Sequence, residues 1–299
     1  MKVAAIVGPT AVGKTEVSLA VAEGLGAEIV SVDSMQVYRG MDVGTAKPSP
    51  ADRARVPHHM LDLFDPTHEL TVAEFQDLGR SAIENVSARG RLPLLVGGSG
   101  LYFRALVDDL HFPPRSEAVR RRLELEAEDE GVAGLYARLL EADPVAAARI
   151  EPGNTRRIVR ALEVIEITGE RFSDNDSWDR YESRYELVVA GLDRSREELD
   201  ERIRKRVEVM LERGLVAEAE AVFSGGPART AAQALGYKQV SEDTSGDLTE
   251  RVSKATRRYA RRQLAWFRAD PRVRWFPADE PGLEGRLTAF FRSELALPL

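Results

Sequence analysis

Cysteine is absent from this 299-residue sequence. Its absence excludes disulfide bonds and thiolate-bound zinc or iron–sulfur centres, and it fits a reducing compartment. Long apolar runs are absent as well. Residues 3–7, VAAIV, form an apolar stretch that is too short for a signal peptide or a membrane span. We therefore expect a cytoplasmic protein that has no membrane partner.

Basic residues are fewer than acidic residues, 42 against 49, so the formal net charge is -7 at pH 7. This average argues against a polyanionic partner, but it says little about local patches. Hydrophobic residues make up 43% and charged residues 30% of the chain, which is typical of a folded globular protein. A chain of this length can bury a large core and form two lobes.

A glycine-rich loop is the first motif in the chain. GPTAVGKT, residues 8–15, matches the phosphate-binding pattern G-x-x-x-x-G-K-[ST], with an apolar run before it and an amphipathic stretch after it. In this pattern the lysine reaches the outer phosphate, and the hydroxyl of Thr15 offers a ligand to Mg²⁺. The residues that we expect to bind phosphate groups are Gly8, Thr10, Ala11, Val12, Gly13, Lys14 and Thr15.

Buried strands are predicted at 3–7, 27–33, 92–98 and 186–193, with 273–277 as an edge strand, and helical patterns separate them. This order predicts an α/β fold with a P-loop NTPase-like parallel sheet. Residues 113–170 show helical spacing and no strand candidate. We expect a P-loop α/β core with C-terminal basic helices at 1–112 and 186–299, and an α-helical insertion domain at 113–185.

The aspartate that usually closes a neighbouring strand in ATPases and GTPases is missing, since the strand at 92–98 leads into Ser99. Only the second strand ends in aspartate, at Asp33, where it can act as general base, hydrogen-bond acceptor, helix cap or second-shell ligand of Mg²⁺. Nearby, Gln36 suits the edge of a base and Tyr38 offers a stacking face. The chain is thus a kinase or a transferase that uses another phosphorylated donor.

Basic residues gather in several helical stretches. The densest is 251–268, with seven lysines and arginines and no acidic residue. One such cluster alone is typical of a solvated helix face, but together, in an acidic protein, they favour a polyanion track. We expect Trp266 and Phe267 to lie in the core. The histidine-containing segment 58–68 lacks the spacing of a metal site, and the pair Asp108–Asp109 lacks the second acidic partner of an isoprenoid synthase motif.

Six motifs occur in a fixed order: GPTAVGKT, SVDSMQVYRGMDVGTAKP, PLLVGGSGLYFRAL, RRIVRALEVIEITG, ALGYKQ and RRQLAWFR. With them the chain resembles the bacterial tRNA dimethylallyltransferase family, the tRNA isopentenyltransferases of the P-loop fold, over nearly its whole length. The resemblance implies transfer of a dimethylallyl group from dimethylallyl diphosphate to the exocyclic amine of the adenosine 3′ to the anticodon, in tRNAs that read codons beginning with U. It implies a tRNA anticodon stem-loop as partner, an insertion domain at 113–185 that binds the tRNA, and Mg²⁺ as cofactor.

The resemblance also implies roles for individual residues. Asp33 accepts a proton or hydrogen bond from the adenine amine, Arg206 grips the diphosphate, and Thr15 completes the catalytic set and holds the metal. Ser99 stands where the family often has threonine, so the hydroxyl is kept and a methyl is lost. The positions that match tRNA contacts are Asp33, Ser34, Met35, Gln36, Ser99, Arg120, Arg156, Arg157, Ile158, Val159, Arg160, Gln233, Gly236, Tyr237 and Lys238.

Two other readings stay open at this point. A P-loop kinase for a nucleoside or small acid would also place an aspartate after the second strand, although such kinases are shorter and rarely need a basic C-terminal helix. A non-enzymatic RNA-binding switch would use nucleotide only for control. The sequence does not determine the oligomeric state; we expect a monomer.

Overall fold

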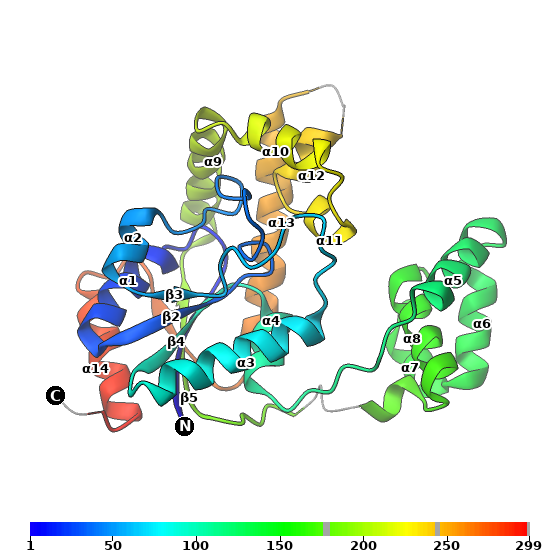
Figure 1. Ribbon diagram of the computed structural model, residues 1–299, viewed down its shortest axis with the longest axis horizontal. Coiled ribbons are helices and arrows are strands. Elements are labelled where there is room, and N and C mark those ends of the chain that lie inside the picture. The colour runs from blue at the N-terminus through cyan, green and yellow to red at the C-terminus, as the bar shows by residue number, and fades with distance from the viewer. Residues whose placement is uncertain (176–179, 243–245, 298–299) are drawn as a thin grey trace. The chain divides into compact units, whose positions relative to one another are not determined.

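The computed structural model describes residues 1–175, 180–242 and 246–297 (Figure 1). Its internal contacts divide the chain into two compact units. The first comprises Met1–Asp108 and Tyr181–Leu299, and the second comprises Asp109–Arg180. The boundaries expected from the sequence, 112/113 and 185/186, lie a few residues further along the chain.

The first unit is built on a six-stranded sheet in which every pairing is parallel. The strand order is β3-β2-β4-β1-β5-β6, so β1 lies inside the sheet between β4 and β5. Parallel strands buried on both faces read as continuous apolar runs, which is why the sequence pattern revealed most of them. The strands are β1 Lys2–Val7, β2 Ala27–Val32, β3 His58–His59, β4 Leu92–Gly97, β5 Glu186–Asp193 and β6 Val273–Pro277.

Helices cover the sheet on both faces and give two apolar cores. In one core, α1 (Lys14–Leu25), α9 (Arg196–Glu212) and α14 (Leu283–Glu294) pack side chains such as Leu19, Ile203 and Phe291 against the strands. In the other, α3 (Val72–Ala88), α4 (Gly100–Val107) and α13 (Leu248–Arg268) contribute residues that include Phe75, Phe103 and Phe267. Further short helices are α2 Pro50–Arg55, α10 Leu215–Ser224, α11 Arg229–Ala232 and α12 Tyr237–Ser241.

Within its described part, the regular elements of the second unit are all helical. It contains α5 (Glu117–Asp129), α6 (Val132–Ala142), α7 (Pro144–Arg149), α8 (Thr155–Thr168) and the 3₁₀ turn η1 (Phe172–Asn175). These elements share a core of their own. No helix in the described residues of either unit is both long and apolar enough to span a bilayer.

The expected α/β class with a parallel sheet is confirmed, including β6 at the sheet edge. The short strand β3 and the helices α2, α4, α11, α12 and α14 were not predicted. Phe267 is buried as expected. The prediction for Trp266 was wrong: its side chain is 37% exposed and lies against Gly100, where an added Cβ would come within 1.9 Å of the indole.

Candidate active site

The phosphate-binding loop connects the C-terminal end of β1 to the N-terminus of α1. Gly8 has φ 144°, and an added Cβ would lie 2.6 Å from the backbone oxygen of Leu192, so a larger residue cannot fit. Gly13 has φ 114° and directly precedes α1. Within the described chain no side chain caps this helix, so its N-terminal amides are available to an anion.

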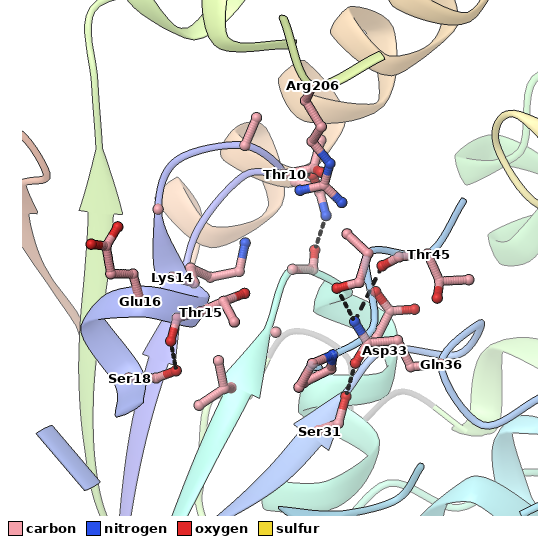
Figure 2. A pocket seen from close by; sticks show the side chains of 18 of the residues that line it. Thr10, Lys14, Thr15, Glu16, Ser18, Ser31, Asp33, Gln36, Thr45 and Arg206 are labelled. Atoms are coloured by element: carbon pink, nitrogen blue, oxygen red, sulfur yellow. Dashed lines mark hydrogen bonds between the residues drawn. The ribbon is translucent and has the colours of Figure 1, made fainter. Parts of the chain in front are cut away.

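Lys14 lies over this loop, and its ammonium donates to the carbonyls of Gly8 (3.0 Å) and Pro9 (2.7 Å). Burial, and next the positive charge of Arg206, lower the pKa of Lys14 to about 7. Asp33 acts in the opposite direction. The three side chains come from α1, α9 and the end of β2 and surround one cavity (Figure 2).

This first cavity has a volume of about 420 Å³. Basic side chains of α9 line it beside the loop. Arg202 donates from Nε to the carbonyl of Ala11 at 2.8 Å, and Lys205 and Arg206 also line the cavity. Burial lowers the pKa of Arg206, while Asp33 raises it. Backbone amides, a helix N-terminus and clustered cations make this cavity suitable for a phosphate or diphosphate.

A second cavity of about 330 Å³ adjoins the first. Both are lined by Thr10, Asp33, Thr45, Arg206 and Tyr259. The second also has apolar walls from α9 and α13. Five of the predicted tRNA-binding positions besides Asp33 line it, namely Ser34, Met35, Ser99, Gln233 and Gly236. The structure therefore brings an anion site and a separate, less charged cavity together.

Asp33 stands where the two cavities meet. Its Oδ1 accepts a hydrogen bond from the backbone N–H of Met35 at 2.8 Å, which fixes the side chain in the turn after β2. Tyr259 also lines both cavities, and burial, followed by the charge of Asp33, raises the pKa of its phenol. A carboxylate held here can reach groups that enter from either cavity.

Gln263 lines the first cavity, and sequence reasoning did not assign it to the site. Its Oε1 accepts from the backbone N–H of Thr10 and its Nε2 donates to the carbonyl of Gly98, both at 2.8 Å. The side chain is only 6% exposed. It thus connects the phosphate-binding loop to the turn after β4. A glutamine on the buried face of the basic helix α13 was the signal that could have revealed it.

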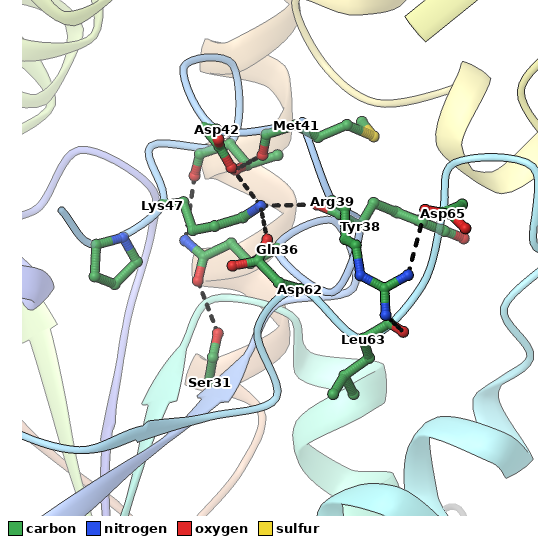
Figure 3. A network of polar contacts seen from close by, with 12 residues as sticks. Ser31, Gln36, Tyr38, Arg39, Met41, Asp42, Lys47, Asp62, Leu63 and Asp65 are labelled. Carbon is green, nitrogen blue, oxygen red and sulfur yellow. Dashed lines mark hydrogen bonds and ion pairs between the residues drawn. The ribbon is translucent and has the colours of Figure 1, made fainter. Parts of the chain in front are cut away.

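The loop after Asp33 is held by polar side chains (Figure 3). Gln36 accepts from the hydroxyl of Ser31 at 2.8 Å and donates to the carbonyl of Thr45 at 3.2 Å. Lys47 is 1% exposed and pairs with Asp42 and Asp62. In this structure the side-chain amide of Gln36 forms hydrogen bonds that stabilise the loop. Its predicted contact with a nucleobase stays a prediction.

Four predicted contacts are corrected by burial. Tyr38 is fully buried in the core, with its hydroxyl donating to the carbonyl of His68, so it offers no stacking face. Tyr237 is also fully buried, and Ile158 and Val159 belong to the core of the second unit. The side chains at these positions are not accessible to an RNA, because neighbouring residues bury them.

The remaining predicted contacts are polar, and each is at least partly exposed. Lys238 is partly exposed and donates to Gln233 at 3.2 Å. In the second unit, Arg120 and Arg160 both bind the fully buried Glu163 at 2.8 Å.

Arg156 and Arg157 in the second unit are exposed and form no ion pair within the described residues. They are the predicted arginines of this unit whose charges remain open to a ligand.

Three comparisons with known proteins agree with this geometry. The model of the IPP transferase family matches residues 36–270. The tRNA dimethylallyltransferase of Thermobifida fusca is 50% identical over 299 residues, covering 96% of this chain and 93% of its own. The one from Kineococcus radiotolerans is 52% identical over 289 residues, covering 92% and 90%.

Solved structures lead to the same family. The tRNA isopentenylpyrophosphate transferase of Bacillus halodurans has a TM-score of 0.73 at 41% identity and covers 99% of this chain and 97% of its own. A eukaryotic dimethylallyltransferase acting on tRNA has a TM-score of 0.82 at 25% identity, covering 100% and 80%. The match of the family model over most of the chain, together with relatives about half identical along its length, shows that this chain belongs to the IPP transferase family.

Proposed function

We propose that this protein transfers a dimethylallyl group from dimethylallyl diphosphate to the exocyclic amine of the adenosine 3′ to the anticodon, in tRNAs that read codons beginning with U. The observation that carries the proposal is the meeting of the two cavities at Asp33. One cavity suits a diphosphate, and the other leaves room for an acceptor base. Family membership supports the same reaction.

In the reaction, the C–O bond between the allylic carbon and the diphosphate breaks, and its electron pair leaves with the diphosphate. A C–N bond forms between that carbon and the adenine amine. Negative charge thus develops on the leaving group, where Lys14, Arg206 and the loop amides can stabilise it. An allylic carbon is stabilised by resonance as this bond weakens, so the charge on the diphosphate is the main quantity for the site to control.

Asp33 accepts the proton that the amine releases. An exocyclic amine of adenine is a weak nucleophile, and a positioned base contributes typically about 10²–10⁴-fold in rate. The fixed orientation of Asp33 by Met35 suits this role, because the second carboxylate oxygen has no hydrogen-bond partner among the described residues. The target base must leave its stack, which costs a few kcal/mol and least in a single-stranded loop.

Mg²⁺ is the cofactor that we propose. The described residues contain no group of three or more histidines and carboxylates that could hold a metal alone. Mg²⁺ often binds through one or two protein ligands and substrate phosphates, and the hydroxyl of Thr15, which lines the first cavity, fits this pattern. When bound, the ion would neutralise charge on the diphosphate.

Exposed cations on α13 support a tRNA partner. Lys254, Arg258, Arg261 and Arg262 are exposed and make no ion pair within the described chain. Arg262 also lines the second cavity. A row of unpaired cations that reaches the acceptor cavity suits a phosphate backbone. A monomer in the cytoplasm remains our prediction for the state and location of the protein.

The proposal is tested by incubating the protein with unmodified tRNA and labelled dimethylallyl diphosphate, without ATP. Transfer of label to the tRNA supports it, and a substrate that lacks the target adenosine serves as control. Consumption of ATP with a small acceptor would instead indicate a kinase. Retention of RNA without transfer would indicate an RNA-binding switch.

A further inference from the structure

Glu218 on α10 holds a loop that is distant in the sequence. Its Oε2 accepts from the backbone N–H groups of Asp42 (3.0 Å) and Val43 (2.9 Å), and its Oε1 accepts from that of Gly44 (3.0 Å). Three successive amides that converge on one group form an anion-binding concavity. In this chain the carboxylate of Glu218 fills it.

Tyr237 completes this arrangement. Its hydroxyl donates to Oε1 of Glu218 at 2.5 Å, and burial, together with Glu218, raises the pKa of the phenol, which therefore stays a donor. The ring lies against Gly44, where an added Cβ would come within 2.3 Å of it. The loop, α10 and α12 are thus joined by a buried aromatic ring and four hydrogen bonds to one carboxylate.

This contact joins two walls of the second cavity. Gly44 and Thr45 line it from the loop, while residues 233–236 line it from the segment between α11 and α12. Leu215, at the start of α10, lies near both Gly44 and Gly236. Removing the carboxylate would leave three amides without their partner and separate these walls.

We propose that Glu218 is a positioning residue for the acceptor: it holds the walls of the second cavity at the spacing that an extruded adenine requires. This inference rests on the proposed function. Glu218 has no hydrogen bond with Lys14, Arg206 or the phosphate-binding loop within the described residues. Its loss therefore affects the KM for the acceptor RNA and leaves the KM for the donor nearly unchanged.

The test compares Glu218→Gln with Glu220→Gln. The first variant keeps the size of the side chain but turns an NH₂ group toward backbone donors. The second makes the same change at an exposed position of the same helix. With an anticodon stem-loop as acceptor, Glu218→Gln is expected to raise the acceptor KM at least about tenfold and the donor KM less than about twofold, since charged hydrogen bonds are the strong ones. Glu220→Gln is expected to match the wild type.

Hydrogen exchange at the amides of Asp42, Val43 and Gly44 gives a second measurement that needs no activity. These amides are expected to exchange faster in Glu218→Gln than in Glu220→Gln or the wild type. Tyr237→Phe, which removes one hydrogen bond, should raise the acceptor KM by a smaller factor, and it replaces Glu218→Gln as the test if that variant does not fold.

Unchanged exchange would show that Glu218 does not hold the loop at Asp42, Val43 and Gly44. An unchanged acceptor KM, or an equal rise in both KM values, would overturn the positioning role. Absence of transfer by the wild type would refute the proposed function and, with it, the acceptor role, while hydrogen exchange would still report whether Glu218 holds the loop.

Discussion

Replacement of Asp33 by asparagine separates the chemistry of the site from its architecture. Asparagine keeps an oxygen that can accept from the N–H of Met35, so the turn after β2 is expected to persist. It removes the negative charge and the ability to take a proton. Loss of a general base predicts a fall in turnover of about 10²–10⁴-fold. That fall corresponds to roughly 2.7–5.5 kcal/mol of barrier.

Binding of both substrates is expected to survive this change. Lys14 and Arg206 remain in the first cavity, and apart from Asp33 itself the residues that line the second cavity are unchanged. Single-turnover measurement with labelled dimethylallyl diphosphate and bound tRNA reports the chemical step, and equilibrium binding reports affinity. Asp65→Asn is a matched control, since the Asp65 side chain is 71% exposed.

The result that refutes this reasoning is specific. If Asp33→Asn keeps more than about a tenth of the wild-type single-turnover rate, Asp33 is not the base, because base catalysis is worth at least about 100-fold. If the rate falls only because tRNA no longer binds, Asp33 acts in recognition.

Three further predictions follow from charges. Because the folded-state pKa of Lys14 is about 7, its ammonium deprotonates as the pH rises through 7, and the donor KM is expected to rise by up to about tenfold per pH unit above it; a flat KM from pH 6 to pH 9 would contradict this. Asp108→Asn removes the carboxylate from a buried cluster with two arginines and should cost about 3–5 kcal/mol of unfolding free energy in urea titrations; a loss below about 1 kcal/mol, typical of an exposed pair, would show that the cluster contributes little. Arg258→Ala and Arg261→Ala should each weaken tRNA binding and lower the salt slope by about 1, while an unchanged slope would place the RNA elsewhere.

The local parts of the site could be predicted from the sequence. The loop at residues 8–15 follows from a short pattern whose glycines are required by backbone angles, and the strand before it from an apolar run. Asp33 was found because carboxyl ends of parallel strands share one edge of the sheet, so a residue after β2 must lie near a loop after β1. These inferences need only adjacent residues and the topology of a parallel sheet.

Tertiary structure alone decided which polar side chains face a cavity and which are buried in the core. Tyr237 lies in a motif that predicted RNA contact, yet its ring covers Gly44 and its hydroxyl binds Glu218, about twenty residues earlier. Gln263 reaches the phosphate-binding loop across 253 residues of sequence. Hydrogen bonds of such separation depend on how α10, α12 and α13 pack against the sheet, and no local pattern encodes that. The sequence thus determined the glycine-rich loop and the aspartate beside it, whereas packing determined the second cavity and the residues that hold it.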